Sequence, residues 1–250
     1  MLDAIVLAGG GTIKDSDYSE NKALVCIHGK TMVEYVVEAL LKSHNIARIL
    51  LIGPKEKLAE IFTGTKIEII EAANTIMDNI ISGINYLGSN RNILVCTSDI
   101  PLVTTQSIDD FISRSLSMNL DLSYPIVEKS LSEKYFPEMK RTYTKLKEGI
   151  FTGGNVFYLN PRIINKGLAI ARELIEARKR PLKMARIVSF KLLIQLMTGT
   201  LTIEKIEKRF SKMLNARASA IISEYPELAN DVDKMSDLLA AKKHLAKRIS

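Results

Sequence analysis

Three consecutive glycines follow an apolar run close to the start of the chain. Gly9, Gly10 and Gly11 come directly after Ala4–Ala8. A buried strand that ends in a glycine-rich loop can bring backbone N–H groups up to a phosphate. The spacing is neither G-x-x-x-x-G-K-[ST] nor G-x-G-x-x-G, so the usual ATPase and dinucleotide fingerprints are absent. Taken alone, the pattern fits a structural tight turn equally well.

A second group with chemical potential is the carboxylate of Asp99. It lies in the stretch 97–102 (TSDIPL), directly after the apolar run Ile93–Cys96, and Pro101 follows two residues later. A carboxylate held rigidly at the end of a buried strand could hold Mg²⁺ against a triphosphate. The alternative is that Asp99 caps the turn that follows it.

The elements that must position these residues alternate between strands and helices. The expected strands are Ile5–Leu7, Arg48–Ile52, Lys66–Ile70, Ile93–Cys96 and Leu120–Ile126, and the expected helices start after Thr31, lie near 55–62, and cover Ile76–Leu87 and Thr105–Met118. This alternation predicts an α/β fold, a Rossmann-like doubly wound and mostly parallel sheet. Because ligands bind at the carboxyl ends of such strands, the glycines and Asp99 should share one rim.

The second half of the chain differs in kind. Residues 128–150 are charged and aromatic and predict an arm that leaves the sheet. A glycine turn then precedes the apolar run Val156–Leu159. Helical pieces are expected near 161–178, 182–197 and 202–214, followed by an apolar stretch at 218–222 and a helix from Ser236 to about Lys247.

Composition limits the class of protein and its partners. The chain of 250 residues is 46% hydrophobic and 25% charged, as is usual for a soluble globular protein. Its net charge of +7 suits anionic partners such as nucleotides and phosphorylated metabolites. Residues 1–8 lack a basic segment and no apolar run approaches ~18 residues. We therefore expect a cytoplasmic protein without a signal peptide or membrane span.

The two cysteines and three histidines indicate no disulfide and no zinc site. Cys26 and Cys96 each lie inside an apolar run, so we interpret both as small buried hydrophobic residues. The histidines are scattered along the chain and lack the spacing of metal ligands.

Taken together, four ordered motifs resemble one family. Residues 7–10 (LAGG), 22–24 (KAL), 98–102 (SDIPL) and 230–238 (NDVDKMSDL) are similar to those of MobA-like nucleotidyltransferases. Their relatives include molybdenum-cofactor guanylyltransferases, methylerythritol-phosphate cytidylyltransferases and sugar-1-phosphate nucleotidylyltransferases. The resemblance implies a sheet of the nucleotide-diphospho-sugar transferase type, a core of residues 1–160 and 216–250, and a helical insertion at 161–215 packed on that core.

The resemblance also implies roles for individual residues. Lys22 would neutralise charge on the α-phosphate of a nucleoside triphosphate, and Asp99 and Asp233 would hold Mg²⁺ while an acceptor phosphate displaces pyrophosphate. The residues implied to contact the nucleotide are Leu7, Ala8, Gly9, Gly10, Gly11, Thr12, Lys14 and Asn79. The alternatives are a solvated surface lysine for Lys22 and, for Asp233, a helix cap shared with Asp231.

Recognition of the acceptor is predicted at two places. Gly153, Gly154 and Asn155 resemble the glycine-asparagine turn that contacts the acceptor in related enzymes. Lys140 and Arg141, just upstream, could hold the acceptor phosphate. The alternative for this basic pair is a solvated loop.

One motif departs from the family pattern. The family usually has L-A-G-G-x-G-T-R, whereas this chain continues with Thr12, Ile13 and Lys14 and lacks the arginine. Lys14 could supply the charge, although as a point charge rather than a bidentate fork. This departure motivates an alternative function, a catalytically inactive nucleotide-binding sensor or scaffold, associated in one version with a membrane surface.

The helical block 161–215 combines basic residues with a strongly apolar stretch at 187–197. Four interpretations remain open: a packed appendage, a basic helix pair that faces a phosphorylated acceptor, a membrane-surface element, and a homo-oligomer surface. The sequence lacks an RNA-recognition motif and an aromatic-basic stripe, which argues against nucleic acid as a partner. The clustered basic residues are Arg172, Arg178, Lys179, Arg180, Lys183 and Arg186.

Overall fold

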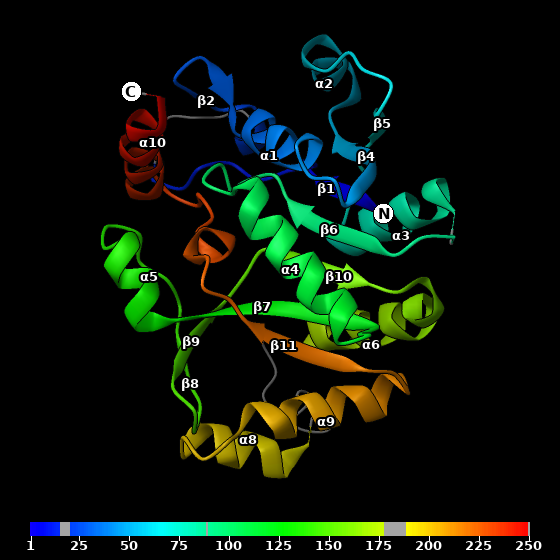
Figure 1. The fold of residues 1–250 in the computed structure, drawn as a ribbon, viewed down its shortest axis with the longest axis vertical. Helices are drawn as coiled ribbons and strands as arrows, with labels where there is room; N and C mark the ends of the chain where they lie inside the picture. The colour runs from blue at the N-terminus through cyan, green and yellow to red at the C-terminus, as the bar shows by residue number, and fades with distance from the viewer. Residues whose placement is uncertain (16–20, 89, 178–188, 250) are drawn as a thin grey trace.

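A computed structural model describes residues 1–15, 21–88, 90–177 and 189–249 (Figure 1). Its centre is a nine-stranded sheet in the order β5-β4-β1-β6-β10-β7-β9-β8, with β11 also paired to β7. The strands are β1 (Leu2–Leu7), β4 (Ile46–Gly53), β5 (Ile67–Glu71), β6 (Ile93–Thr97), β7 (Leu122–Glu128), β8 (Thr144–Lys145), β9 (Ile150–Gly153), β10 (Val156–Leu159) and β11 (Ala218–Ile222). The predicted α/β class and mostly parallel sheet are confirmed.

Helices cover both faces of this sheet, which explains its continuously apolar strands. In β4, Ile49 and Leu51 face α1 (Met32–Leu41) and α4 (Thr105–Ser117), whereas Leu50 and Ile52 belong to the cluster around α3 (Ile76–Leu87) and α6 (Ile164–Ala177). Strands buried on both faces have no polar side to show, so they do not alternate. α2 (Lys55–Ile61) completes the β4–β5 crossover.

One antiparallel strand interrupts the parallel order. β10 lies between β6 and β7 and runs antiparallel to both. The predicted arm is in fact structured: α5 (Lys129–Tyr135) follows β7, and the chain returns through β8 and β9 to extend the sheet. The arm has weak periodicity because β8 is only two residues long and both of its residues are exposed.

The C-terminal helix α10 (Met235–Ile249) packs beside the segment that follows the glycine loop (Figure 1). Leu238 and Leu245 share an apolar cluster with Val25, Ile27 and Met32. This cluster fixes the chain between β11 and α10 against η1 (Lys22–Leu24), a single 3₁₀ turn. The segment that follows β1 and the segment that leads into α10 therefore meet at one rim of the sheet.

The described helical block contains η2 (Pro161–Ile163), α6, α8 (Phe190–Met197) and α9 (Ile203–Leu214). The expected gap between the pieces near 182–197 and 202–214 lies between α8 and α9, and it contains Gly199, whose φ of +66° favours glycine. α8 and α9 lie under β8, β9 and β11 (Figure 1). Five of the clustered basic residues, between 178 and 186, lie outside the described residues.

The interpretation of Cys26 as a buried residue is wrong. Cys26 is exposed and Cys96 is buried, and both are free thiols. Cys26 belongs to the small ribbon of β2 (Cys26–Ile27) and β3 (Lys30–Thr31), where Ile27 takes the buried side and Cys26 the opposite one. In the described part of the chain, every helix is too short or too polar to cross a bilayer.

Candidate active site

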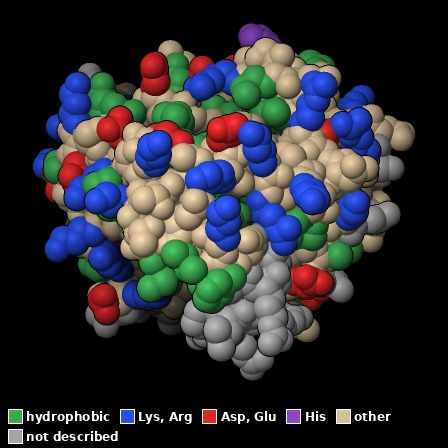
Figure 2. Space-filling model, turned by 90° about the horizontal axis from the view of Figure 1, so that it is seen from below, with side chains coloured by type: hydrophobic (Ala, Val, Ile, Leu, Met, Phe, Trp, Pro, Cys, Tyr) green, Lys and Arg blue, Asp and Glu red, His purple; other side chains and the backbone are tan. Residues whose placement is uncertain are grey.

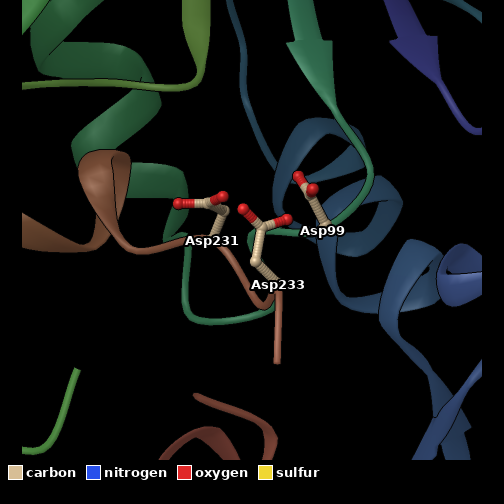
Figure 3. Close-up of side chains that lie close together, drawn as sticks. All are labelled: Asp99, Asp231 and Asp233. Atoms are coloured by element: carbon tan, nitrogen blue, oxygen red, sulfur yellow. The ribbon is translucent and has the colours of Figure 1, made fainter. Parts of the chain in front are cut away.

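Three aspartates meet at the carboxyl end of β6 (Figure 3). One carboxylate oxygen each of Asp99, Asp231 and Asp233 lies within 4.8 Å of the others. Asp99 follows β6, and the other two come from the segment before α10. The backbone N–H of Val232 donates to the carbonyl of Asp99 over 2.8 Å, which holds the two segments together.

Asp231 is a site residue that the sequence prediction missed. Val232 is fully buried, and the aspartates on either side of it lie in a row with Asp99, with Asp233 between Asp231 and Asp99 (Figure 3). A spacing of two in an extended segment puts both side chains on the same side. The Asp-Val-Asp pattern was therefore a usable signal for a paired site, beyond the helix cap considered for it.

Lys22 lies at the centre of this cluster. Its ammonium contacts the carboxylate of Asp99 and, at 2.7 Å, Oδ1 of Asp233, and its side chain is only 15% exposed. Lys22 is thus not a solvated surface lysine. Burial by itself would lower the pKa of Lys22, but the charges of Asp99 and Asp233 outweigh it and raise the pKa above the usual value.

Asn21 positions Lys22 relative to the glycine loop. Its Nδ2 donates to the carbonyl of Ala8 over 2.7 Å, and its Oδ1 accepts from the N–H of Ala23 over 3.0 Å. One side chain therefore joins the end of β1 to the turn that carries the lysine. The sequence signal was an asparagine directly before a short helical turn, the usual place for a cap.

The acidic groups differ in their affinity for protons. Burial, together with the charges of Asp99 and Asp233, raises the pKa of Asp231 to about 6. Burial acts in the same direction on Asp233, but the hydrogen bond from Lys22 outweighs it and lowers the pKa of that carboxyl. Asp231 therefore takes up a proton at a higher pH than Asp233 does.

The donor set fits Mg²⁺. Carboxylate oxygens are the ligands that this ion prefers, and three of them converge here. Oδ1 of Asp99 is buried and has no hydrogen-bond partner among the described residues, which leaves it available to a cation.

The glycine loop folds back over the lysine turn. A Cβ atom at Gly9 would lie 2.8 Å from Cβ of Ala72, and Gly11 has φ +91°. The N–H of Lys22 donates to the carbonyl of Gly11 over 2.9 Å. A Cβ atom at Gly10 would contact nothing within 4 Å, so Gly10 faces open space.

The remaining residues predicted for the nucleotide surround this loop. Leu7 is the last residue of β1 and Ala8 follows it, Thr12 is exposed, and Asn79 is buried directly behind Gly9. Oδ1 of Asn79 accepts from the N–H of Ala73 over 2.6 Å and so holds the 72–74 turn in place. That turn and Gly9 line a cavity of about 410 Å³, together with Asn21, Leu24, Pro54, Lys57 and Glu71.

The backbone of Lys14 forms hydrogen bonds with the C-terminal segment at the start of α10. Its N–H donates to the carbonyl of Asp233 over 2.9 Å, and its own carbonyl accepts from Met235 over 3.2 Å. The positive charge of Lys14 contributes to the low pKa of Asp233. The residue that stands where the family has an arginine therefore lies beside the acidic cluster.

All five residues predicted for the acceptor line one polar pocket of about 420 Å³. Lys140, Arg141, Gly153, Gly154 and Asn155 meet there with Lys14, Asp231 and Asp233. Arg141 is not in a solvated loop: it is 7% exposed, contacts Asp231 and pairs with Asp237 at 2.9 Å. Lys140, by contrast, is exposed at the pocket.

The paired glycines are required by packing against β7. A Cβ atom at Gly153 would lie 2.0 Å from the hydroxyl oxygen of Tyr124, and one at Gly154 would lie 2.7 Å from Cγ of Pro125. Tyr124 and Thr152 also line the pocket and were not predicted. The sequence offers no specific signal for them, because Tyr124 looks like any strand residue.

Comparison with known proteins agrees with this architecture. A model of the MobA-like NTP transferase domain matches residues 4–150. A structure from Thermus thermophilus, described as a hypothetical transferase, is 34% identical with a TM-score of 0.83 and covers 95% of this chain and 99% of its own. No curated protein matches the chain significantly.

Two more distant structures share the fold. A CMP:2-keto-3-deoxy-manno-octonic acid synthetase in complex with CTP is 12% identical, with a TM-score of 0.59 over 99% of this chain and 98% of its own. A 4-diphosphocytidyl-2C-methyl-D-erythritol synthase from Anaerococcus prevotii is 11% identical, with a TM-score of 0.59 over 98% and 96%.

Proposed function

Because the chain belongs to the family of MobA-like NTP transferase domains, we propose that it is a Mg²⁺-dependent nucleotidyltransferase. It transfers an NMP group from an NTP to a phosphorylated small molecule and releases pyrophosphate. We place this activity in the cytoplasm, where both substrates would be available.

The observation that carries this proposal is the contact of Lys22 with Asp99 and Asp233 between two cavities. Asn21, the residue before Lys22, lines the cavity at Gly9, and Asp233, which Lys22 contacts, lines the polar pocket with Lys140. A triphosphate bound along the glycine loop would present its α-phosphorus to the lysine. An acceptor phosphate would reach this phosphorus from the polar pocket, and the reaction requires it to be in line with the leaving pyrophosphate.

In this mechanism the residues supply charge and position rather than a nucleophile. The loop amides hold the triphosphate, and the ammonium of Lys22 offsets the charge that develops on the α-phosphate. An oxygen of the acceptor phosphate forms the new bond to phosphorus, and the bond to the β-phosphate oxygen breaks as pyrophosphate leaves. Asp99, Asp231 and Asp233 would hold Mg²⁺, which when bound neutralises the triphosphate and polarises its phosphorus.

The test is release of pyrophosphate from ATP, CTP, GTP or UTP with Mg²⁺ over a panel of phosphomonoesters. We expect turnover with one NTP and loss of it without Mg²⁺. Turnover that persists in both Lys22→Ala and Asp99→Ala would overturn the assignment of the site.

A second candidate function rests on Thr12-Ile13-Lys14. Because the backbone of Lys14 is tied to Asp233 and Met235, the loop could bind an NTP without the arginine that the family uses. The protein would then be a sensor or scaffold. Calorimetry separates the two: tight NTP binding with no turnover on any acceptor would favour the sensor, and absence of NTP binding would exclude both.

A further inference from the structure

A second pocket adjoins the polar one and is almost entirely apolar. Its volume is about 500 Å³, and it lies between β7, β9 and β11 on one side and α8 and α9 on the other. None of the described lining residues carries a charge. They include Ile126, Phe151, Leu192, Leu193, Leu196 and Ile206.

The two pockets meet at three residues. Tyr124, Thr152 and Gly153 line both of them. The Tyr124 hydroxyl lies over Gly153, so closely that a Cβ atom there would be 2.0 Å from it. The Tyr124 ring stacks on Phe157, with ring centroids 4.8 Å apart. An aromatic ring with a polar tip is suited to a boundary between an apolar and a polar space.

We propose that the acceptor is an amphiphilic phosphomonoester, whose phosphate lies in the polar pocket and whose apolar portion fills this cavity. The inference rests on the proposed function and names the substrate class of the same site. When the phosphate of the acceptor lies near Lys140 and Asn155, the rest of the acceptor must occupy a space next to the polar pocket. Across Tyr124 and Gly153, the adjoining space is the apolar cavity.

The surface around the cavity supports an anionic amphiphile as the occupant. In Figure 2 Lys and Arg side chains are spread over the face that carries α8 and α9, with an apolar patch among them. Lys145, Lys147, Lys191 and Lys205 are exposed on these elements and on the β8 hairpin. Such a face attracts an anion that also carries an apolar group.

The proposal predicts a dependence on chain length. Burial of one methylene contributes about 0.8 kcal/mol, which corresponds to about a fourfold gain in affinity. In a series of methyl, butyl and hexyl phosphate below their aggregation limits, the KM should fall about fourfold per added methylene. Calorimetry of the same compounds without NTP should give the same trend in Kd and a negative heat-capacity change.

Two neighbouring residues on α8 supply a matched pair of variants. Leu196 lines the cavity and is 37% exposed, whereas Met197 is 81% exposed and is not among the lining residues. Leu196→Lys should abolish the dependence on chain length and leave methyl phosphate unaffected. Met197→Lys should show the same dependence on chain length as the wild-type protein. Ala220→Leu, which narrows the cavity without adding charge, provides a second test if Leu196→Lys unfolds the helix.

Each outcome decides one of the two proposals. If methyl and hexyl phosphate are equally good acceptors, the proposal of an amphiphilic acceptor is wrong, whereas the proposed transferase activity is supported. If no phosphomonoester supports turnover, the proposed transferase activity is wrong. Calorimetry of the alkyl phosphates then still shows whether the apolar cavity binds their alkyl chains. Dimerisation that Leu196→Lys abolishes and hexyl phosphate does not affect would identify the cavity as an interface between copies and overturn the proposal.

Discussion

Nζ of Lys22 lies 2.7 Å from Oδ1 of Asp233, although the two residues are 211 positions apart in the chain. The same ammonium contacts Asp99, and Arg141 pairs with Asp231 and Asp237. Four carboxylates thus face two buried cations, and Lys14 acts on Asp233 from beside them. Because Oδ1 of Asp99 is buried and has no hydrogen-bond partner among the described residues, a further cation is favoured there.

The role of Lys22 is tested by its removal. Lys22→Ala should lower kcat about 100-fold, because a charge aimed at the developing negative charge contributes about 2.7–4 kcal/mol to such reactions. NTP affinity, measured by calorimetry, should change far less. Lys30→Ala is the matched control, since Lys30 pairs with Glu38 on the surface. A fall in affinity with kcat unchanged would reduce Lys22 to a binding residue.

The acidic cluster is tested by the response to Mg²⁺. A ligand that binds only the folded state raises its stability by mass action, so millimolar Mg²⁺ should raise the Tm of the unchanged protein. Asp99→Asn should remove this rise, because Oδ1 of Asp99 is buried and finds no hydrogen-bond partner among the residues that the structure describes. Glu60→Gln, an exposed carboxylate on α2, is the control. An equal rise in all three proteins would mean that the ion binds elsewhere.

Binding of Mg²⁺ should depend on pH. The pKa of Asp231 is raised to about 6, so below this value the carboxyl is protonated and must release its proton when the ion binds. Affinity should therefore be about tenfold weaker at pH 5 than on the plateau above pH 7. Titrations by calorimetry would measure this slope. Asp231→Asn should bind Mg²⁺ more weakly and should not show the loss of affinity between pH 7 and pH 5. If this loss persists in Asp231→Asn, it has another origin.

The three glycines should respond differently to alanine. Gly9→Ala and Gly11→Ala should destabilise the protein by roughly 1–3 kcal/mol, through the contact with Ala72 and the positive φ respectively. Gly10→Ala should fold normally, because its Cβ would meet nothing within 4 Å.

Gly10→Ala should nevertheless bind NTP at least about tenfold more weakly, since a methyl group that displaces a phosphate loses a charge-assisted hydrogen bond of about 1.5–3 kcal/mol. Gly64→Ala, at another open glycine position, is the control. Unchanged NTP affinity in Gly10→Ala would show that the triphosphate does not lie along this loop.

The sequence alone determined the alternation of strands and helices from β1 to α4, and it predicted that Gly9 and Asp99 lie at one rim of the sheet. Apolar strands without alternation, the span Ile76–Leu87 and the motifs around Gly9, Lys22 and Asp99 are local signals, because periodicity and strand ends act over a few residues. These signals were sufficient for the parallel sheet and for the glycine loop beside Asp99.

The tertiary structure decided which residues from distant parts of the chain become neighbours. Packing of α10 against the N-terminal turn brings Asp231 and Asp233 to Lys22, and this proximity depends on contacts between distant parts of the chain. The same packing buries Arg141 between two aspartates, so its charge already has partners, whereas Lys140 next to it stays exposed. The apolar cavity exists only because α8 and α9 close over the sheet. Such contacts are set by packing across the whole molecule, and a pattern read along the chain cannot specify them.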